Sequence, residues 1–327
     1  MYVALHNRSL IKVHGVDSVK LLQNLTTNDV NRLRHRETDQ DPTAPPAPSA
    51  ISSAILNNLG RVLFDVIIYG PADAAANEFY VECEQDARDD LVKHFKKYKL
   101  RSKVKFAVED GLEVTAFVGK KAADLALQYS KNTNEIAVTD PRHPGLGTRA
   151  MVPTVAAADV GVSLTSPDFM SNLVEGTLTD YVRCRYHVGV PEGLVEITKE
   201  EAFPLESNFD VLNGIDFDKG CYIGQELTAR AKFVGVTRKR LLPVTIQPAL
   251  NPETAPLSGT KIYHKGKSVG KFKRGIDSDG MALLRLSVTH IEDDAELTME
   301  GPDGTTYQVH HQRPAWFMDM LKEMDES

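Results

Sequence analysis

Hydrophobic positions in the first third of the chain predict alternating helices and strands. Apolar side chains at helical spacing predict an amphipathic helix over 17–25, for which Asp17 is a suitable N-cap. The same pattern predicts a second helix over 86–98. Period-two runs predict strands, two of which flank the turn formers of 57–60 and indicate a hairpin. These strands cover 53–56, 62–69, 78–83, 104–106 and 114–118. The alternation indicates an α+β lobe.

The pattern changes to short strands alone in the last quarter of the chain. The strands are predicted over 241–246, 261–264, 269–272, 282–286, 296–299 and 307–311. Their even spacing indicates a small β-barrel or sandwich of about six strands. A helix is predicted over 173–185, whereas 119–175 shows no clear pattern. We therefore expect an α+β module over 1–240 and a β-barrel over 241–327.

Composition narrows the class of protein. The 327 residues include 42% hydrophobic and 25% charged residues, which is typical of globular domains. The segment 38–49 contains four prolines and is predicted to be a loop or an insertion. A net charge of −7 argues against a nucleic-acid partner. No apolar run approaches the roughly 18 residues that a membrane span needs, so we expect no membrane partner.

Cysteine usage points to free thiols. Cys83, Cys184 and Cys221 are too few and too scattered for a disulfide framework. None of them has the spacing of a zinc site. We therefore expect a reducing compartment, in which the thiols can act as ligands or nucleophiles.

The segment 219–226, with the sequence Lys-Gly-Cys-Tyr-Ile-Gly-Gln-Glu, is the strongest candidate for chemistry. A cation such as Lys219 and a following helix N-terminus both lower the pKa of a thiol, here Cys221. Gly220 and Gly224 allow unusual backbone angles and let another surface come close. A small buried hydrophobe in a Gly-rich turn is the alternative, since free cysteines are often buried. The clustering of Lys, Gly and Gln-Glu around one thiol favours function.

Three further charged residues have competing interpretations. Asp65 lies among apolar strand residues and is expected to be partly buried, either in an ion pair with an arginine such as Arg61 or in a ligand site. Arg185 precedes a Gly, as a cation at a helix C-terminus does. Glu206 is either a partner for a basic group near Cys221 or a capping or surface carboxylate.

Taken together, these motifs resemble the YgfZ-type proteins. That family includes mitochondrial iron–sulfur cluster assembly factors of the Iba type and is related to the folate-dependent aminomethyltransferase of the glycine cleavage system. The resemblance runs in order along nearly the whole chain. Its matching segments are 22–30, 60–65, 185–191, 204–208, 219–226 and 266–270.

The resemblance implies both a fold and a role. The fold is α+β, with two intertwined aminomethyltransferase-like lobes and a C-terminal β-barrel around a folate-sized opening. The role is the maturation of [4Fe–4S] proteins in the mitochondrial matrix together with A-type cluster carriers. It also implies a targeting segment in the precursor. Tetrahydrofolate contacts would fall at Asn28, Asp65, Arg185 and Glu206.

Iron–sulfur clusters normally take four protein ligands, usually thiolates. Cys83 lies in a predicted strand and Cys184 in a predicted helix, where we expect it to be buried. The chain, which we expect to be a monomer alone, should therefore not hold a cluster by itself. We hypothesise that Cys221 is one ligand of a [2Fe–2S] or [4Fe–4S] cluster shared with an A-type carrier. The remaining motif residues would contact that partner, namely Lys219, Gly220, Tyr222, Gly224, Gln225 and Glu226.

A tetrahydrofolate-dependent aminomethyltransferase is the alternative function. Such an enzyme needs a carboxylate for proton transfer at the folate nitrogen. The related transferases carry an Asn-Ala pair and a later Asp around 81–89, but here Glu82 and Cys83 replace the pair and Asp89 is at most a remnant. This departure argues against turnover and leaves folate binding open. A thiol redox role is weaker still, because no resolving cysteine lies near Cys221.

Overall fold

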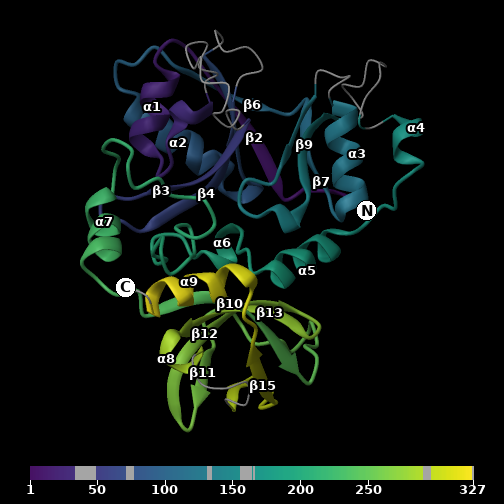
Figure 1. Cartoon of the computed structure of the whole chain (residues 1–327), viewed down its shortest axis with the longest axis vertical. Coiled ribbons are helices and arrows are strands. Elements are labelled where there is room, and N and C mark those ends of the chain that lie inside the picture. The colour runs from purple at the N-terminus through teal and green to yellow at the C-terminus, as the bar shows by residue number, and fades with distance from the viewer. Residues whose placement is uncertain are drawn as a thin grey trace.

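The computed structural model describes residues 1–33, 49–70, 77–130, 135–154, 164, 166–289 and 296–325. Two β-sheets lie side by side, and a β-barrel lies below them with short helices between (Figure 1). The proline-rich segment predicted over 38–49 falls outside the described residues except for Ser49.

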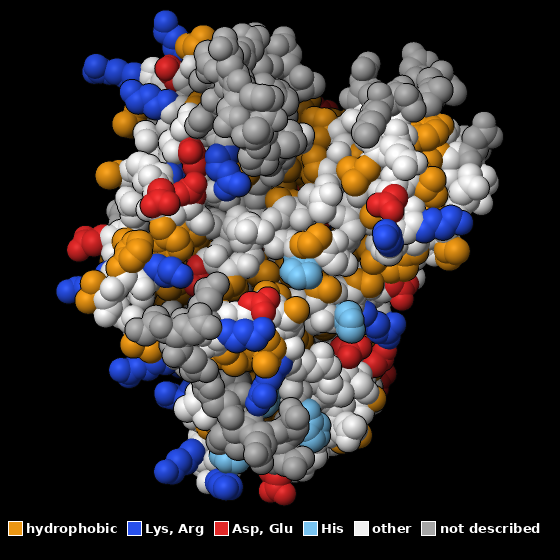
Figure 2. Space-filling view, in the orientation of Figure 1, with side chains coloured by type: hydrophobic (Ala, Val, Ile, Leu, Met, Phe, Trp, Pro, Cys, Tyr) orange, Lys and Arg blue, Asp and Glu red, His pale blue; other side chains and the backbone are white. Residues whose placement is uncertain are grey.

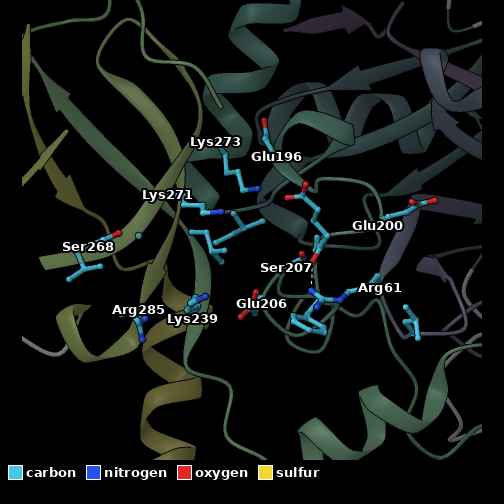
Figure 3. Close-up of a pocket in the computed structure, with 18 residues that line it drawn as sticks. Arg61, Glu196, Glu200, Glu206, Ser207, Lys239, Ser268, Lys271, Lys273 and Arg285 are labelled. Carbon is cyan, nitrogen blue, oxygen red and sulfur yellow. Dashed lines mark hydrogen bonds between the residues drawn. The ribbon is translucent and has the colours of Figure 1, made fainter. Parts of the chain in front are cut away.

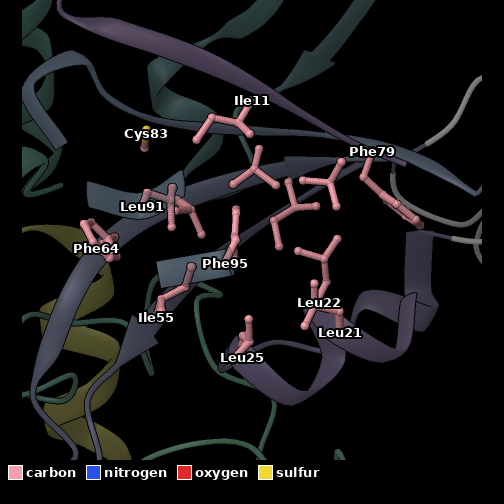
Figure 4. Packing of buried hydrophobic residues seen from close by; sticks show 14 of the residues in the cluster. Ile11, Leu21, Leu22, Leu25, Ile55, Phe64, Phe79, Cys83, Leu91 and Phe95 are labelled. Atoms are coloured by element: carbon pink, nitrogen blue, oxygen red, sulfur yellow. The ribbon is translucent and has the colours of Figure 1, made fainter. Parts of the chain in front are cut away.

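A five-stranded sheet with two covering helices forms the first lobe. Its strand order is β3 (Ala50–Leu56), β4 (Val62–Tyr69), β5 (Glu78–Glu84), β2 (Arg8–His14), β6 (Lys105–Glu109). The predicted hairpin and both predicted helices are confirmed, as α1 (Ser18–Leu25) and α2 (Arg88–Lys99). Leucines of α1 pack with Phe79, Phe95 and Ile11 into one apolar core (Figure 4). Asp17 does not cap α1, because its carboxylate accepts a hydrogen bond from the Lys103 backbone N–H at 2.7 Å.

The second lobe is a four-stranded sheet that takes its edge strand from the start of the chain. Its order is β1 (Tyr2–Ala4), β7 (Leu112–Phe117), β9 (Thr148–Pro153), β8 (Ile136–Thr139), with α3 (Lys120–Ser130) against it. Because β1 pairs with β7 while β2 belongs to the other sheet, the two lobes are intertwined as expected. The segment 119–175 showed no clear pattern in the sequence, but its described residues contain these elements.

Short helices connect the lobes to the barrel. They are α5 (Leu178–Val188), α6 (Gly193–Glu196) and α7 (Gln225–Phe233), whereas α4 (Pro167–Met170) packs its Phe169 against Phe117 and Tyr129 of the second lobe. The helix predicted over 173–185 starts later, because Thr177 and Asp180 form a capping box that fixes the first turn at Leu178. Gly189 ends it in the left-handed conformation, as the sequence indicated.

The C-terminal strands close into a six-stranded antiparallel barrel, which confirms the predicted number. Around the barrel they follow the order β10 (Lys239–Gln247), β13 (Asp279–Arg285), β12 (Lys267–Ile276), β11 (Lys261–His264), β14 (Leu297–Glu300), β15 (Thr306–His311), with α8 (Leu286–Thr289) after β13. An unpredicted helix, α9 (Ala315–Asp325), packs Trp316 and Phe317 against residues of the α+β module. Trp316 Nε1 also donates to the Val188 carbonyl at 2.9 Å. The barrel is thereby fixed to the module.

Candidate functional site

The cysteine-containing loop before α7 is anchored to the end of α1 by one buried lysine. Lys219 Nζ donates to the backbone carbonyls of Gln23, Thr26 and Asn28 at 2.5–2.9 Å. The carbonyls at the end of a helix lack partners within it, so a cation there is favourable. The Ile223 backbone N–H adds a hydrogen bond to the Asn24 carbonyl at 3.1 Å.

This anchoring corrects the role predicted for Lys219. The sequence suggested that its charge activates the neighbouring thiol. The side chain instead turns inward, with 8% of the residue exposed, and its three hydrogen bonds all go to backbone carbonyls. Burial lowers the pKa of Lys219 to about 8. Tyr222 is likewise buried, with Lys219 Nζ 5.0 Å from its ring centre, so both residues support the loop from inside.

The two glycines of the motif have different roles. Gly224 has φ +81°, and a Cβ there would lie 2.5 Å from the Asn57 carbonyl oxygen in the β3–β4 turn. Its missing side chain therefore serves contact with the protein's own hairpin, which corrects the prediction that it clears a path for a partner. Gly220 is exposed, and a Cβ there would meet no atom within 4 Å. Gly220 is thus the glycine that leaves space beside Cys221.

Of the three cysteines, Cys221 is the exposed one. Cys83 is fully buried in β5, and burial raises the pKa of its thiol to about 12. Cys184 in α5 is half-buried, rather than buried as predicted, and burial also raises its pKa. The described residues bring no three His, Cys, Asp or Glu side chains together as a metal site would.

An apolar surface lies next to the cysteine loop. Its members are large hydrophobic residues on α7, on the segment after it and on the β3–β4 turn, and we call them the α7 patch. They are Leu59, Leu227, Phe233, Val234 and Val236, with 73%, 39%, 69%, 81% and 71% exposed. The ring of Phe233 also lies edge-on to that of Phe217, which precedes the cysteine in the same loop. Figure 2 shows hydrophobic side chains gathered over α7.

The residues implied as folate contacts do not converge on one cavity. Asn28 donates to the carbonyls of Ser52 and Asn213 and lines a surface pocket near β8. Glu206 lies in a cleft beside the barrel, where burial raises its pKa. Asp65 lines a cavity of about 20 Å³. A volume of this size holds about one water molecule, whereas small-molecule sites usually have several hundred Å³.

Asp65 and Arg185 belong instead to a buried ionic network. Asp65 pairs with Arg8 at 3.3 Å, rather than with the suggested Arg61. Arg185 is paired with Glu196 through two hydrogen bonds of 2.8 and 3.0 Å, so it does more than cap its helix. The network contains four arginines and five carboxylates, which are Arg8, Arg142, Arg149, Arg185, Asp65, Glu82, Asp140, Glu192 and Glu196.

The network joins the two sheets and α5, and most of its residues were not predicted from the sequence as site residues. Arg149 on β9 donates to both carboxylate oxygens of Glu82 on β5, at 2.5 and 2.8 Å. Neighbouring arginines lower the pKa of Glu82 despite its burial. For both Arg149 and Glu82, the signal that the sequence offered was a charged residue within a strand that also contains apolar residues. Its partner, 67 positions away, could not be read from the sequence.

Comparison with known proteins identifies the family to which the chain is related. Residues 238–319 match the family model described as "CAF17, C-terminal beta-barrel domain". The chain is 36% identical to the Neosartorya fischeri protein named "Iron-sulfur cluster assembly factor IBA57 homolog, mitochondrial", over 94% of this chain and 74% of the relative. It is also 36% identical to the human protein named "Iron-sulfur cluster assembly factor IBA57, mitochondrial", over 86% of this chain and 76% of the relative.

Among solved structures, the fold is similar to that of the glycine cleavage system aminomethyltransferase T from Bartonella henselae. The TM-score is 0.71, with 12% identity over 96% of this chain and 85% of the other. This likeness confirms the aminomethyltransferase-like fold, and it concerns the fold alone. The extended identity to the assembly factors, together with the ordered motifs, shows that the chain belongs to the IBA57 family of mitochondrial iron–sulfur cluster assembly factors.

Proposed function

We propose that this protein is an iron–sulfur cluster assembly factor of mitochondria, where it acts in the matrix in the maturation of [4Fe–4S] proteins. The observation that carries the proposal is the presentation of Cys221. The exposed thiol belongs to a loop that the hydrogen bonds of Lys219 anchor to the end of α1 and that packs on the β3–β4 turn at Gly224. A fixed ligand loses little conformational freedom when it binds, which favours capture of a cluster.

The cluster is shared with a partner, for which we propose an A-type carrier protein. Cysteine is the usual cluster ligand and four ligands are usual. Cys83 is in the core of a sheet and Cys184 is half-buried in α5, so neither belongs to the loop of Cys221. The other ligands then come from the carrier, and the cluster is the cargo that passes between the two proteins.

The carrier docks on the surface around the cysteine loop. The α7 patch exposes several large apolar side chains, and such patches mark protein interfaces. Gly220, Gln225 and Glu226 also reach the surface near Cys221 and would border the contact. Lys219, Tyr222 and Gly224 support the loop and do not themselves face the partner.

Anaerobic reconstitution with and without an A-type carrier tests the proposal. We expect the mixture to form a complex with a visible cluster spectrum, and Cys221→Ser to lose or alter that spectrum while the protein keeps its Tm. Cys184→Ser is the matched control and should leave the spectrum as it is. An unchanged spectrum with Cys221→Ser would refute the shared ligand. Size exclusion of the protein alone tests the expected monomer.

A titration with tetrahydrofolate tests the cofactor that the family resemblance implies. Because the cavity at Asp65 is about 20 Å³, folate binding there requires the cavity to open. Saturable binding that Asp65→Asn abolishes would support folate as a ligand. The transferase alternative requires, in addition, that the protein transfer a one-carbon unit to the bound folate.

A further inference from the structure

A cleft separates the barrel from the α+β module, and neither the cysteine loop nor the ionic network accounts for its charges. It has a volume of about 730 Å³ and lies between β12, β13 and the segment 200–207. We call it the barrel cleft. Five cationic side chains line it: Arg61, Lys239, Lys271, Lys273 and Arg285. Figure 3 shows Lys271 and Lys273 extending from the barrel toward the segment that carries Glu206 and Ser207.

The cations come from separate parts of the sequence, and the fold brings them to one cavity. Lys239 begins β10, Lys271 and Lys273 lie on β12, and Arg285 ends β13. Within the described residues none of the five lies within 4 Å of a carboxylate oxygen. Lys273 is 9% exposed, and its ammonium donates to Thr198 Oγ1 at 2.7 Å. Like charges placed together without counter-charges repel one another.

The carboxylates of the cleft do not neutralise these cations. Glu196 is already paired with Arg185 in the ionic network. Glu200 and Glu201 line the cleft on its module side, where both are exposed, and Glu201 lies within electrostatic range of Lys273 without an ion pair to it. Glu206 is half-buried and lies within electrostatic range of Lys239, Arg61 and Lys273 without an ion pair to any of them. The barrel wall therefore keeps an excess of positive charge in a protein whose net charge is −7.

The cleft also offers apolar and planar surface. Leu241, Leu283 and Val269 line it on the barrel side. On the opposite side, the guanidinium of Arg61 stacks on the ring of Phe203, with its central carbon 3.5 Å from the ring centre. Arg61 Nη1 already donates to the Glu201 carbonyl at 2.5 Å, and the remaining N–H groups of the guanidinium point along its plane, where phosphate or carboxylate oxygens can accept them.

We propose that the barrel cleft binds a small polyanion, an organic molecule with two or more phosphate or carboxylate groups on an apolar body. The volume lies within the range of small-molecule sites and argues for such a ligand. The anionic groups contact Lys239, Lys271, Lys273 and Arg285, and the apolar body covers the leucines. This site does not depend on Cys221 or on the cluster.

Calorimetric titration at low ionic strength tests the proposal, with tripolyphosphate as the phosphate probe and citrate as the carboxylate probe. The test variant is Lys271→Gln/Arg285→Gln, because both side chains are exposed and their loss should not impair folding. The control variant, Lys261→Gln/Lys267→Gln, removes two exposed lysines of the barrel that lie outside the cleft. Both variants change the net charge equally.

We expect saturable binding of one probe to the wild type and to the control, and weakening of about tenfold or more in the test variant, since bonds between charged groups are the strong ones. The probe that binds more tightly shows whether the cleft prefers phosphate or carboxylate groups. Equal weakening in both variants would indicate unspecific attraction and overturn the proposal. So would the absence of saturable binding to the wild type up to about 1 mM, the range of weak affinities.

Discussion

Replacing Gly224 by Ala is expected to loosen the cysteine loop from the β3–β4 turn. Gly224 has φ +81°, which costs an L-residue about 1–2 kcal/mol. The new Cβ would lie 2.5 Å from the Asn57 carbonyl oxygen and 2.9 Å from Leu56 Cβ, so the backbone must shift, at a further cost of about 1–3 kcal/mol. The free energy of unfolding should fall by about 2–5 kcal/mol, and Tm by about 3–7 °C.

Thermal unfolding by calorimetry measures this loss, and alkylation of Cys221 in the folded state reports on the loop. Gly220→Ala is the matched control, four positions earlier in the same motif. Gly220 has no positive φ, and its Cβ would meet no atom within 4 Å, so stability should change by less than about 0.5 kcal/mol. Equal Tm values for the two variants would refute the assignment of Gly224 to internal packing.

Three further variants test the buried charges. Arg149→Met leaves the buried Glu82 short of a partner and should cost about 3–5 kcal/mol in urea unfolding, whereas Arg88→Met on the surface should cost less than about 1 kcal/mol. Burial lowers the pKa of Lys219 from 10.5 to about 8, so between these pH values the unfolded chain holds the ammonium proton that the folded protein has lost. The stability of the wild type relative to Lys219→Met should therefore rise as the pH increases from 8 to 10.5. Burial lowers the pKa of His94 to about 4, so the wild type should lose stability relative to His94→Phe as pH falls from 6.5 to 4; parallel urea curves would contradict this assignment.

Local patterns predicted most of the secondary structure because each depends on near neighbours in the chain. The six barrel strands and the hairpin at 57–60 follow from period-two alternation and turn residues. The lobe around 119–175 was missed because its Ala- and Thr-rich strands show little contrast between their faces. In the part of the chain that the structure describes, no helix combines the length and apolar character needed to cross a membrane.

The candidate site was predicted only in part. Cys221 is exposed in a loop before a helix, as the motif suggested, and Gly220 leaves space beside it. The inward direction of Lys219 was not predicted, because its partners lie more than 190 positions earlier in the chain. Asp65 was correctly expected to be partly buried, but its partner Arg8 comes from a strand on the far side of β5.

The sequence by itself determined most of the elements, the exposed thiol of Cys221 and the family to which the motifs belong. These properties depend on residues that are close together in the chain, because hydrophobic periodicity, turn-forming residues and motif spacing are all local features of the sequence. The tertiary structure decided which polar groups meet. It places the ammonium of Lys219 on the carbonyls at and just after the end of α1, pairs the arginines with the buried carboxylates, and gathers the cations of the barrel cleft. Such pairings depend on how the sheets and the barrel are placed in space, because a charge interacts with whatever lies within a few ångströms of it, at any distance along the chain.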